Sequence, residues 1–115
     1  MNYNLESRTA IFGVMVIDFC KSIKPSIISD SIVRQIVRSS TSVGANYMEA
    51  NQASSRRDFS NKIRLCQKEA NETKHWLRMI SAIDDNYKKD GLVLYKEAHE
   101  LTLIFAAISR SLNKN

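Results

Sequence analysis

The chain has 115 residues and a formal net charge of +5. A chain of this length fits one domain and leaves no room for two, so we expect a single domain over residues 1–115. Hydrophobic residues make up 43% of the chain and charged residues 25%, which is ordinary for a globular protein. With three glycines and one proline, few turns are available. This composition disfavours a β-sandwich or barrel and favours long helices.

The first predicted helix spans residues 7–23. Within it, Phe12, Met15 and Phe19 recur at spacings of three and four residues, which puts them on one face together with Ile23. A Lys-Pro pair follows and should end the helix, because the residue before a proline is pushed out of the helical region. We expect this face to lie in the core.

The opposite face of this helix is also apolar and contains Ala10, Val14 and Ile17. One bundle cannot cover two opposite faces of the same helix, and exposed apolar strips of this kind mark interfaces. We therefore predict that Ala10, Val14 and Ile17 lie in an interface between copies of this chain.

The second predicted helix spans residues 31–53, with Asp30 or Ser29 as its N-cap. Small residues occupy its centre around Gly44, and a glycine inside a helix costs about 1 kcal/mol relative to alanine. Such a position often allows another backbone to approach closely. The face expected in the core consists of Ile32, Ile36, Ser40, Val43, Tyr47 and Ala50.

Two further helices, over residues 56–85 and 92–112, have the clearest patterns. Ser55 and Asp58 resemble a capping box at the start of the first, and residues 86–91 should form the turn between the two. Short connections between four amphipathic helices predict an all-α, antiparallel up-down-up-down four-helix bundle. The expected core positions are Phe59, Ile63, Cys66, Ala70, Thr73, Leu77 and Ile80, then Leu94, Ala98, Leu101, Phe105, Ile108 and Leu112.

A metal site is one function that helical bundles host. A di-iron site uses two Glu-x-x-His pairs and two further glutamates, all pointing inward. Glu72 and His75 form one such pair, but the other histidine, His99, follows Glu97 by two residues, which separates the two side chains around a helix. Half of the ligand set is missing, so we expect no metal and no cofactor.

Catalytic motifs are absent as well. The sequence has no nucleophile elbow and no glycine-rich phosphate loop, so we expect no catalytic residues. Glu49, Glu69 and Glu72 could form an acid–base cluster. Carboxylates on helix flanks more often pair with an arginine, and Arg38 is a candidate partner, so we favour the structural interpretation.

Cysteine usage and the N-terminus bear on the compartment. Cys20 and Cys66 lie at apolar positions of helical patterns without a metal-binding spacing, and we expect two buried, reduced thiols. The N-terminus lacks the pattern of a secretory signal, and the apolar run from residue 10 to residue 20 is interrupted by Asp18 and too short to span a bilayer. We expect a cytoplasmic protein without a membrane partner.

One face of the third helix is basic, whereas its acidic residues Asp58, Glu69 and Glu72 point elsewhere. We call this surface the basic face; it consists of Arg56, Arg57, Arg64, Lys68, His75 and Arg78. Most charge runs are only a solvated helix face, but an ordinary face mixes both signs. The pattern therefore suggests a site for RNA or DNA. The face contains no aromatic residue, so base stacking should contribute little.

The stretch from Arg38 to Ala50, RSSTSVGANYMEA, resembles the signature of a known family. These are four-helix-bundle proteins encoded in intervening sequences of bacterial large-subunit ribosomal RNA genes, and the family includes the accessory variability determinant (Avd) of diversity-generating retroelements. A phenylalanine, Phe59, follows as in the family, and the order of helices matches along nearly the whole chain. The chain departs from the pattern in having Ala50 where glycine is usual.

The resemblance implies a homo-oligomer, commonly a pentamer. For the Avd branch it implies association with nucleic acid beside a reverse transcriptase, and for most members it implies no established biochemical activity. It also implies structural roles for the signature residues: small side chains for close packing, and hydrogen bonds from Asn46 and Glu49 that join helix ends or subunits.

Together these observations predict a non-enzymatic, homo-oligomeric bundle that binds nucleic acid through the basic face, with a reverse transcriptase as one candidate partner. The alternative is a structural or protein–protein interaction module on which the basic face is incidental. A metalloenzyme is the third hypothesis, and the missing ligands disfavour it.

Overall fold

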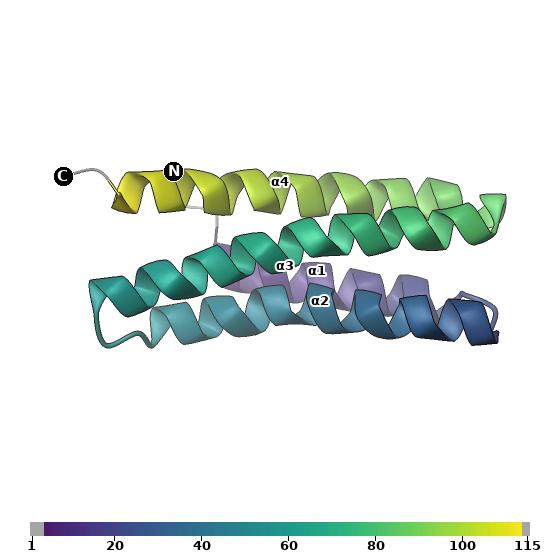
Figure 1. The fold of residues 1–115 in the computed structure, drawn as a ribbon, viewed down its shortest axis with the longest axis horizontal. Coiled ribbons are helices and arrows are strands. Elements are labelled where there is room, and N and C mark those ends of the chain that lie inside the picture. The colour runs from purple at the N-terminus through teal and green to yellow at the C-terminus, as the bar shows by residue number, and fades with distance from the viewer. Residues whose placement is uncertain (1–3, 114–115) are drawn as a thin grey trace.

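The computed structural model describes residues 4–113, and within that range it contains four long α-helices and no β-strand. The helices are α1 (Leu5–Lys21), α2 (Ile27–Asn51), α3 (Arg56–Ile83) and α4 (Lys88–Leu112), with a short 3₁₀ turn, η1 (Asp85–Tyr87), before the last. Each helix runs antiparallel to the one before it, which confirms the predicted up-down-up-down bundle (Figure 1). The bundle measures 48 × 21 × 20 Å, and none of its described helices is both long and apolar enough to cross a bilayer.

The start of α2 differs from the prediction. Ser26 caps the helix, because its hydroxyl oxygen accepts a hydrogen bond from the backbone N–H of Ser29 at 2.9 Å. The helix therefore begins at Ile27, and neither Ser29 nor Asp30 is its cap. The first turn was missed because Ser26, Ser29 and Asp30 are all residue types that cap helices, and the sequence alone does not choose among them.

The connection between α3 and α4 is shorter than predicted. The expected turn over residues 86–91 is wrong, because α3 ends at Ile83 and α4 begins at Lys88. Gly91 lies inside α4, where a Cβ atom would come within 2.7 Å of the Ser81 hydroxyl oxygen. This glycine allows α4 to pack closely on α3 and does not form a turn.

Most core positions are the predicted ones, but Ile32 and Tyr47 of α2 are only partly buried, and Leu5 and Ile104 are buried without having been predicted. One position of α1 also needs a correction. Phe12, Phe19 and Ile23 are buried as predicted, but Met15 is 39% exposed. Val16 is fully buried in its place. Both residues have the spacing of a core position, and the choice between them depends on α1 packing mainly against α2. In α3 and α4 the predicted positions are buried, except that Phe59, Ile108 and Leu112 are partly buried.

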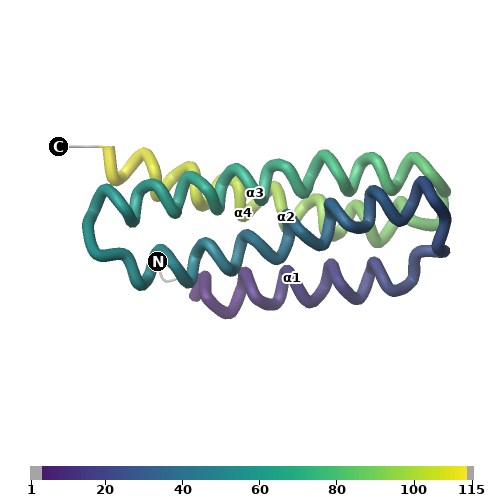
Figure 2. Tube along the Cα trace, turned by 60° about the horizontal axis from the view of Figure 1, so that its bottom comes forward, coloured from purple at the N-terminus to yellow at the C-terminus, as the bar shows by residue number. Residues whose placement is uncertain are grey.

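Small residues bring α1 and α2 together, as Gly44 led us to expect. A Cβ atom at Gly44 would lie 3.4 Å from the Thr9 hydroxyl oxygen and 3.6 Å from the Thr9 carbonyl carbon. The Thr9 side chain is itself buried and donates a hydrogen bond to the Leu5 carbonyl at 2.7 Å. The two backbones therefore meet where α2 has its smallest side chain. Figure 2 shows α1 running along α2 at the edge of the bundle.

We predict that Gly44→Leu destabilises the fold by about 1–3 kcal/mol, because the new side chain must push α1 away from α2. The change would be measured as the free energy of unfolding in urea. Ala45→Leu is the matched control: Ala45 is the next residue of α2 and is exposed, so the same side chain there should change stability by less than about 0.5 kcal/mol. Equal stability of the two variants would contradict the close approach.

Candidate nucleic-acid interface

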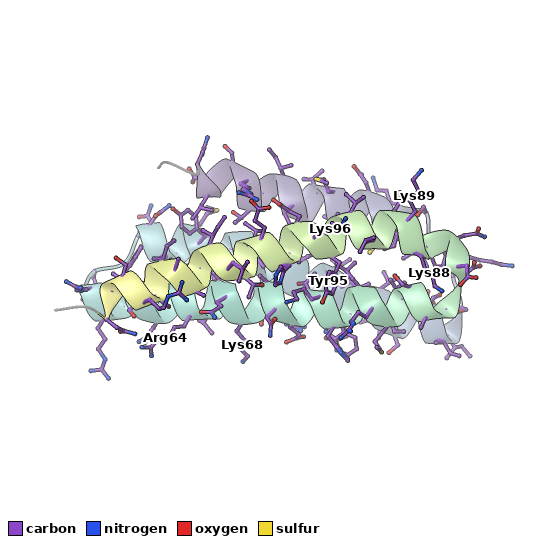
Figure 3. All side chains as sticks on the ribbon, turned by 90° about the horizontal axis from the view of Figure 1, so that it is seen from above. Arg64, Lys68, Lys88, Lys89, Tyr95 and Lys96 are labelled. Atoms are coloured by element: carbon purple, nitrogen blue, oxygen red, sulfur yellow. The ribbon has the colours of Figure 1, made fainter. Side chains whose placement is uncertain are left out.

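The basic face lies on the outward side of α3. All six of its predicted residues are exposed, and Figure 3 shows Arg64 and Lys68 along the outer edge of the helix. No carboxylate of residues 4–113 lies within 4 Å of the charged nitrogens of Arg57, Arg64, Lys68 or Arg78. These cations therefore have water as their main partner in the monomer, which leaves them available to an anionic ligand.

The glutamates of α3 turn away from this face toward α2. Arg38 of α2 binds Glu69 with its Nη1 at 2.9 Å from Oε2, and its Nη2 donates to Glu72. Glu72 also accepts a hydrogen bond from the Trp76 indole N–H at 2.8 Å. The predicted pairing with Arg38 is confirmed for Glu69 and Glu72, since both carboxylates are held by hydrogen bonds to this arginine.

The glutamates of α4 turn toward α1. Arg8 donates to both carboxylate oxygens of Glu97 at 2.8 Å and to Glu100 at 3.0 Å. The hydrogen bonds to Glu97 raise the pKa of Arg8 above its ordinary value. This bidentate pair links α1 to α4, and it removes two more carboxylates from the surface that α3 and α4 share. No local sequence pattern indicates this pair, since 89 residues separate Arg8 from Glu97.

The N-terminal end of the basic face is hollowed. Ser55 caps α3 as predicted, accepting the backbone N–H of Asp58 at 3.0 Å. Arg56 donates from Nη2 to the Leu112 carbonyl at the end of α4, at 2.8 Å. The hollow has a volume of about 450 Å³, and its lining consists of Arg56, Arg57, Ser60, Asn61, Arg64 and Leu112. Three guanidinium groups and no carboxylate line this hollow, so it is basic.

His75 lies on the basic face but differs from its other members. Its ring packs edge-on against Trp76, with the ring centroids 4.9 Å apart. Glu72, its predicted partner in a Glu-x-x-His pair, is held by Arg38 and Trp76. No group of three or more histidine, cysteine or acidic side chains among residues 4–113 is placed to hold a metal ion.

A groove between α3 and α4 adjoins the other end of the basic face, and the sequence analysis did not find it. We call it the Tyr95 groove. Its volume is about 630 Å³, and its lining includes Leu77, Arg78 and Ala82 of α3 and Lys88, Leu92 and Tyr95 of α4. Only the packing of α4 against α3 brings these residues together, and no single-helix pattern could have shown it.

The predicted interface residues of α1 lie outside the core. Val14 is 57% exposed, Ile17 is 37% exposed and Ala10 is exposed. Ile11 on the same helix is exposed as well, although its position was not part of the prediction. The apolar face of α1 therefore exists in the monomer as a surface in contact with water.

The two thiols are in protected positions. Cys66 is fully buried, and burial raises its pKa to about 12. Cys20 is partly buried, and burial raises its pKa to about 11. Both thiols are therefore protonated near neutral pH and weak as nucleophiles, which agrees with the prediction of structural cysteines.

Comparison with known proteins identifies the family. Residues 8–107 match the model of the 23S rRNA-intervening sequence protein family. The chain belongs to this family. A crystal structure of a protein of unknown function from the S23 ribosomal protein family of Bacteroides thetaiotaomicron is similar, with 30% sequence identity and a TM-score of 0.80. The match covers 90% of this chain and 96% of that one. No curated protein sequence matches.

The signature stretch of this intervening sequence protein has a mainly structural role in the monomer. Arg38 holds α3 through Glu69 and Glu72, and the Ser39 hydroxyl lies 2.8 Å from that of Thr73 in the core. Glu49 pairs with Lys62 at 2.7 Å across the ends of α2 and α3, in agreement with its expected role.

Asn46, a second signature residue, does not join helices within the chain. Its side-chain amide donates to the Ser42 carbonyl of its own helix at 2.8 Å. The expectation that it links helix ends is therefore wrong for the monomer. A contact between subunits stays a prediction for this residue.

We predict that Arg38→Met lowers the free energy of unfolding by about 1–2 kcal/mol, because it leaves the buried Glu69 carboxylate without its partner. The loss is limited because the Arg38 side chain is 46% exposed. Urea denaturation would measure it, and adding Glu69→Gln should restore part of the loss. Arg34→Met is the control and should be nearly neutral, because Arg34 is exposed and has no carboxylate within 4 Å among residues 4–113. A neutral Arg38→Met would contradict the structural role.

Proposed function

We propose that this intervening sequence protein is a non-enzymatic, homo-oligomeric module that binds RNA or DNA through the basic face of α3. The observation on which the proposal depends is the segregation of charge. The glutamates of α3 and α4 pair with Arg38 and Arg8 on the flanks, while the arginines and lysine of the basic face have no carboxylate within 4 Å in the described part of the chain. An ordinary solvated face has no such separation of sign.

The geometry of the face favours contacts with the phosphate backbone. From Arg57 to Arg78 it extends for about 32 Å, at 1.5 Å per helical residue. Point charges along one line read the repeating phosphates and not the base edges, so binding depends little on sequence and falls steeply with salt. The hollow around Arg57 and Arg64 at one end offers guanidinium groups to one phosphate from more than one side.

The apolar face of α1 supports the oligomeric part of the proposal, with a second copy of this chain as its occupant. Val14, Ile17 and the neighbouring Ile11 are exposed in the monomer, and burying them between copies removes apolar surface from water. Their helix lies diagonally across the bundle from α3, and within residues 4–113 no Cα atom of α1 comes within 8 Å of one of α3. A contact through α1 therefore leaves the basic face open. The pentameric number and the role beside a reverse transcriptase rest on the family resemblance alone.

The second candidate function is a structural or protein–protein interaction module. The exposed apolar strip that flanks the α2–α3 ion pairs favours it: Leu65, Met79 and Ile83 are each about two-fifths exposed. Such a strip fits a protein partner better than a nucleic acid. The two candidates differ in whether the charge of α3 matters for binding.

We predict that Arg64→Glu combined with Lys68→Glu weakens binding of a short RNA by more than tenfold at low salt and reduces the slope of affinity against salt concentration. Fluorescence anisotropy would measure it. The matched control is Lys21→Glu with Lys24→Glu, which makes the same change in net charge at exposed positions at the C-terminal end of α1 and just after it, away from α3. Equal loss in both double variants would mean that net charge, not the basic face, is responsible. Absence of binding by the wild type would reject the nucleic-acid function.

We predict that Val14→Glu shifts the protein toward the 13.1 kDa monomer, because it places a charge in the apolar contact between copies. Light scattering at micromolar concentration would measure the mass, and circular dichroism would show that helicity is unchanged. The control Ala45→Glu puts the same charge on the exposed side of α2 and should leave the mass unaltered. A wild-type protein that is already monomeric would contradict the assembly.

A further inference from the structure

The Tyr95 groove is continuous with the basic face, because Arg78 belongs to both. Its floor is apolar: Leu77 is 1% exposed and lies between the two helices, where Gly91 lets them approach closely. A volume of about 630 Å³ falls within the range of small-molecule sites, about 300–1,000 Å³. The groove is therefore large enough for a flat group and begins where the row of cations ends.

Tyr95 gives the groove an aromatic wall. Figure 3 places it on the side of α4 that faces α3. The ring is partly buried, and its hydroxyl makes no hydrogen bond to residues 4–113. Lys74 holds its ammonium group 5.6 Å from the ring centroid and lies 3.0 Å from the His99 ring nitrogen. The ring therefore contacts Lys74 of α3 and also lines the groove.

The charges around the groove select an anionic occupant. Arg78 has no carboxylate within 4 Å among the described residues, and no acidic side chain lines the groove. Lys88 on the opposite rim pairs with Asp85 at 2.8 Å, but both side chains are more than half exposed, so this pair contributes little and can exchange. A ligand that fits this groove has a flat apolar group, which packs on Tyr95 and Leu77, joined to a negative charge, which lies near Arg78.

We propose that the Tyr95 groove receives an unpaired base of a single-stranded nucleic acid whose phosphates lie along the basic face. Every base has a π-face that can stack on an aromatic ring, and Arg78 is placed to hold the adjoining phosphate. A base within a duplex is already stacked and paired and cannot enter the groove, so the site favours single strands. This inference rests on the proposed function and revises the expectation of little stacking, which considered the residues of α3 alone.

The test compares three labelled probes of equal length by fluorescence anisotropy: an oligoadenylate single strand, the same strand with abasic residues in its centre, and a duplex. Tyr95→Leu keeps an apolar side chain but removes the π-face, and Tyr95→Phe keeps the ring and is the matched control. The wild type should bind the intact strand about tenfold more tightly than the abasic strand. Tyr95→Leu should abolish that ratio without changing affinity for the abasic strand, and Tyr95→Phe should preserve it.

Each outcome has a distinct meaning. The ratio of intact to abasic affinity is measured on one protein sample, so partial unfolding of a variant does not alter it. Equal affinity of the wild type for the intact and abasic strands would overturn the inference, and would fit a groove that is filled by a protein partner or by nothing. If Arg64→Glu with Lys68→Glu still weakened binding by more than tenfold in that case, the proposed function would stand without the base site. No binding of any probe by the wild type would overturn both.

Discussion

The pairing of Arg38 with Glu69 and Glu72 is the interaction on which both the packing and the surface of this protein depend. It holds α2 and α3 in one register, beside the buried hydroxyls of Ser39 and Thr73. Because an arginine supplied by α2 must reach both carboxylates, Glu69 and Glu72 have to lie on the α2 side of α3. The outward side of α3 is then left with cations alone. Stability and charge segregation therefore have the same cause in this helix.

Arg8 has the equivalent effect on α4. It draws Glu97 and Glu100 toward α1, and it does so at the helix pair with the sparsest packing among neighbours. Few apolar side chains interdigitate between α1 and α4. The bidentate, charge-assisted contact therefore helps to fix the position of one helix relative to the other. The result is that α3 and α4 present a joint surface whose acids lie at its margins. Arg38 and Arg8 lie outside this surface, but by pairing with the glutamates they leave it with a positive charge.

The core-facing residues of α3 and α4 could be predicted from sequence. In each helix, apolar residues recur regularly at spacings of three and four, and only one face is apolar along its whole length. In α1 the repeat allowed either Met15 or Val16, and only the position of α2 decides between them. The start of α2 and the short α3–α4 connection were missed for a related reason. Ser26, Ser29 and Asp30 are all residue types that cap helices, and Gly91 is of a type common in turns although here it allows α4 to pack on α3.

One part of the candidate site could be predicted from local sequence patterns, and the other could not. The basic face could be predicted because all its members lie on one helix, where spacing alone determines direction. The Tyr95 groove could not, because it needs residues from two helices at a register that no local pattern records. Its distance from α1 has a further consequence. Since α1 and α3 lie on opposite sides of the bundle, the proposed assembly through the apolar face of α1 would turn every basic face and groove outward. Sites that are weak in one chain would then act together on one strand, with affinity gained from their number and not from new contacts.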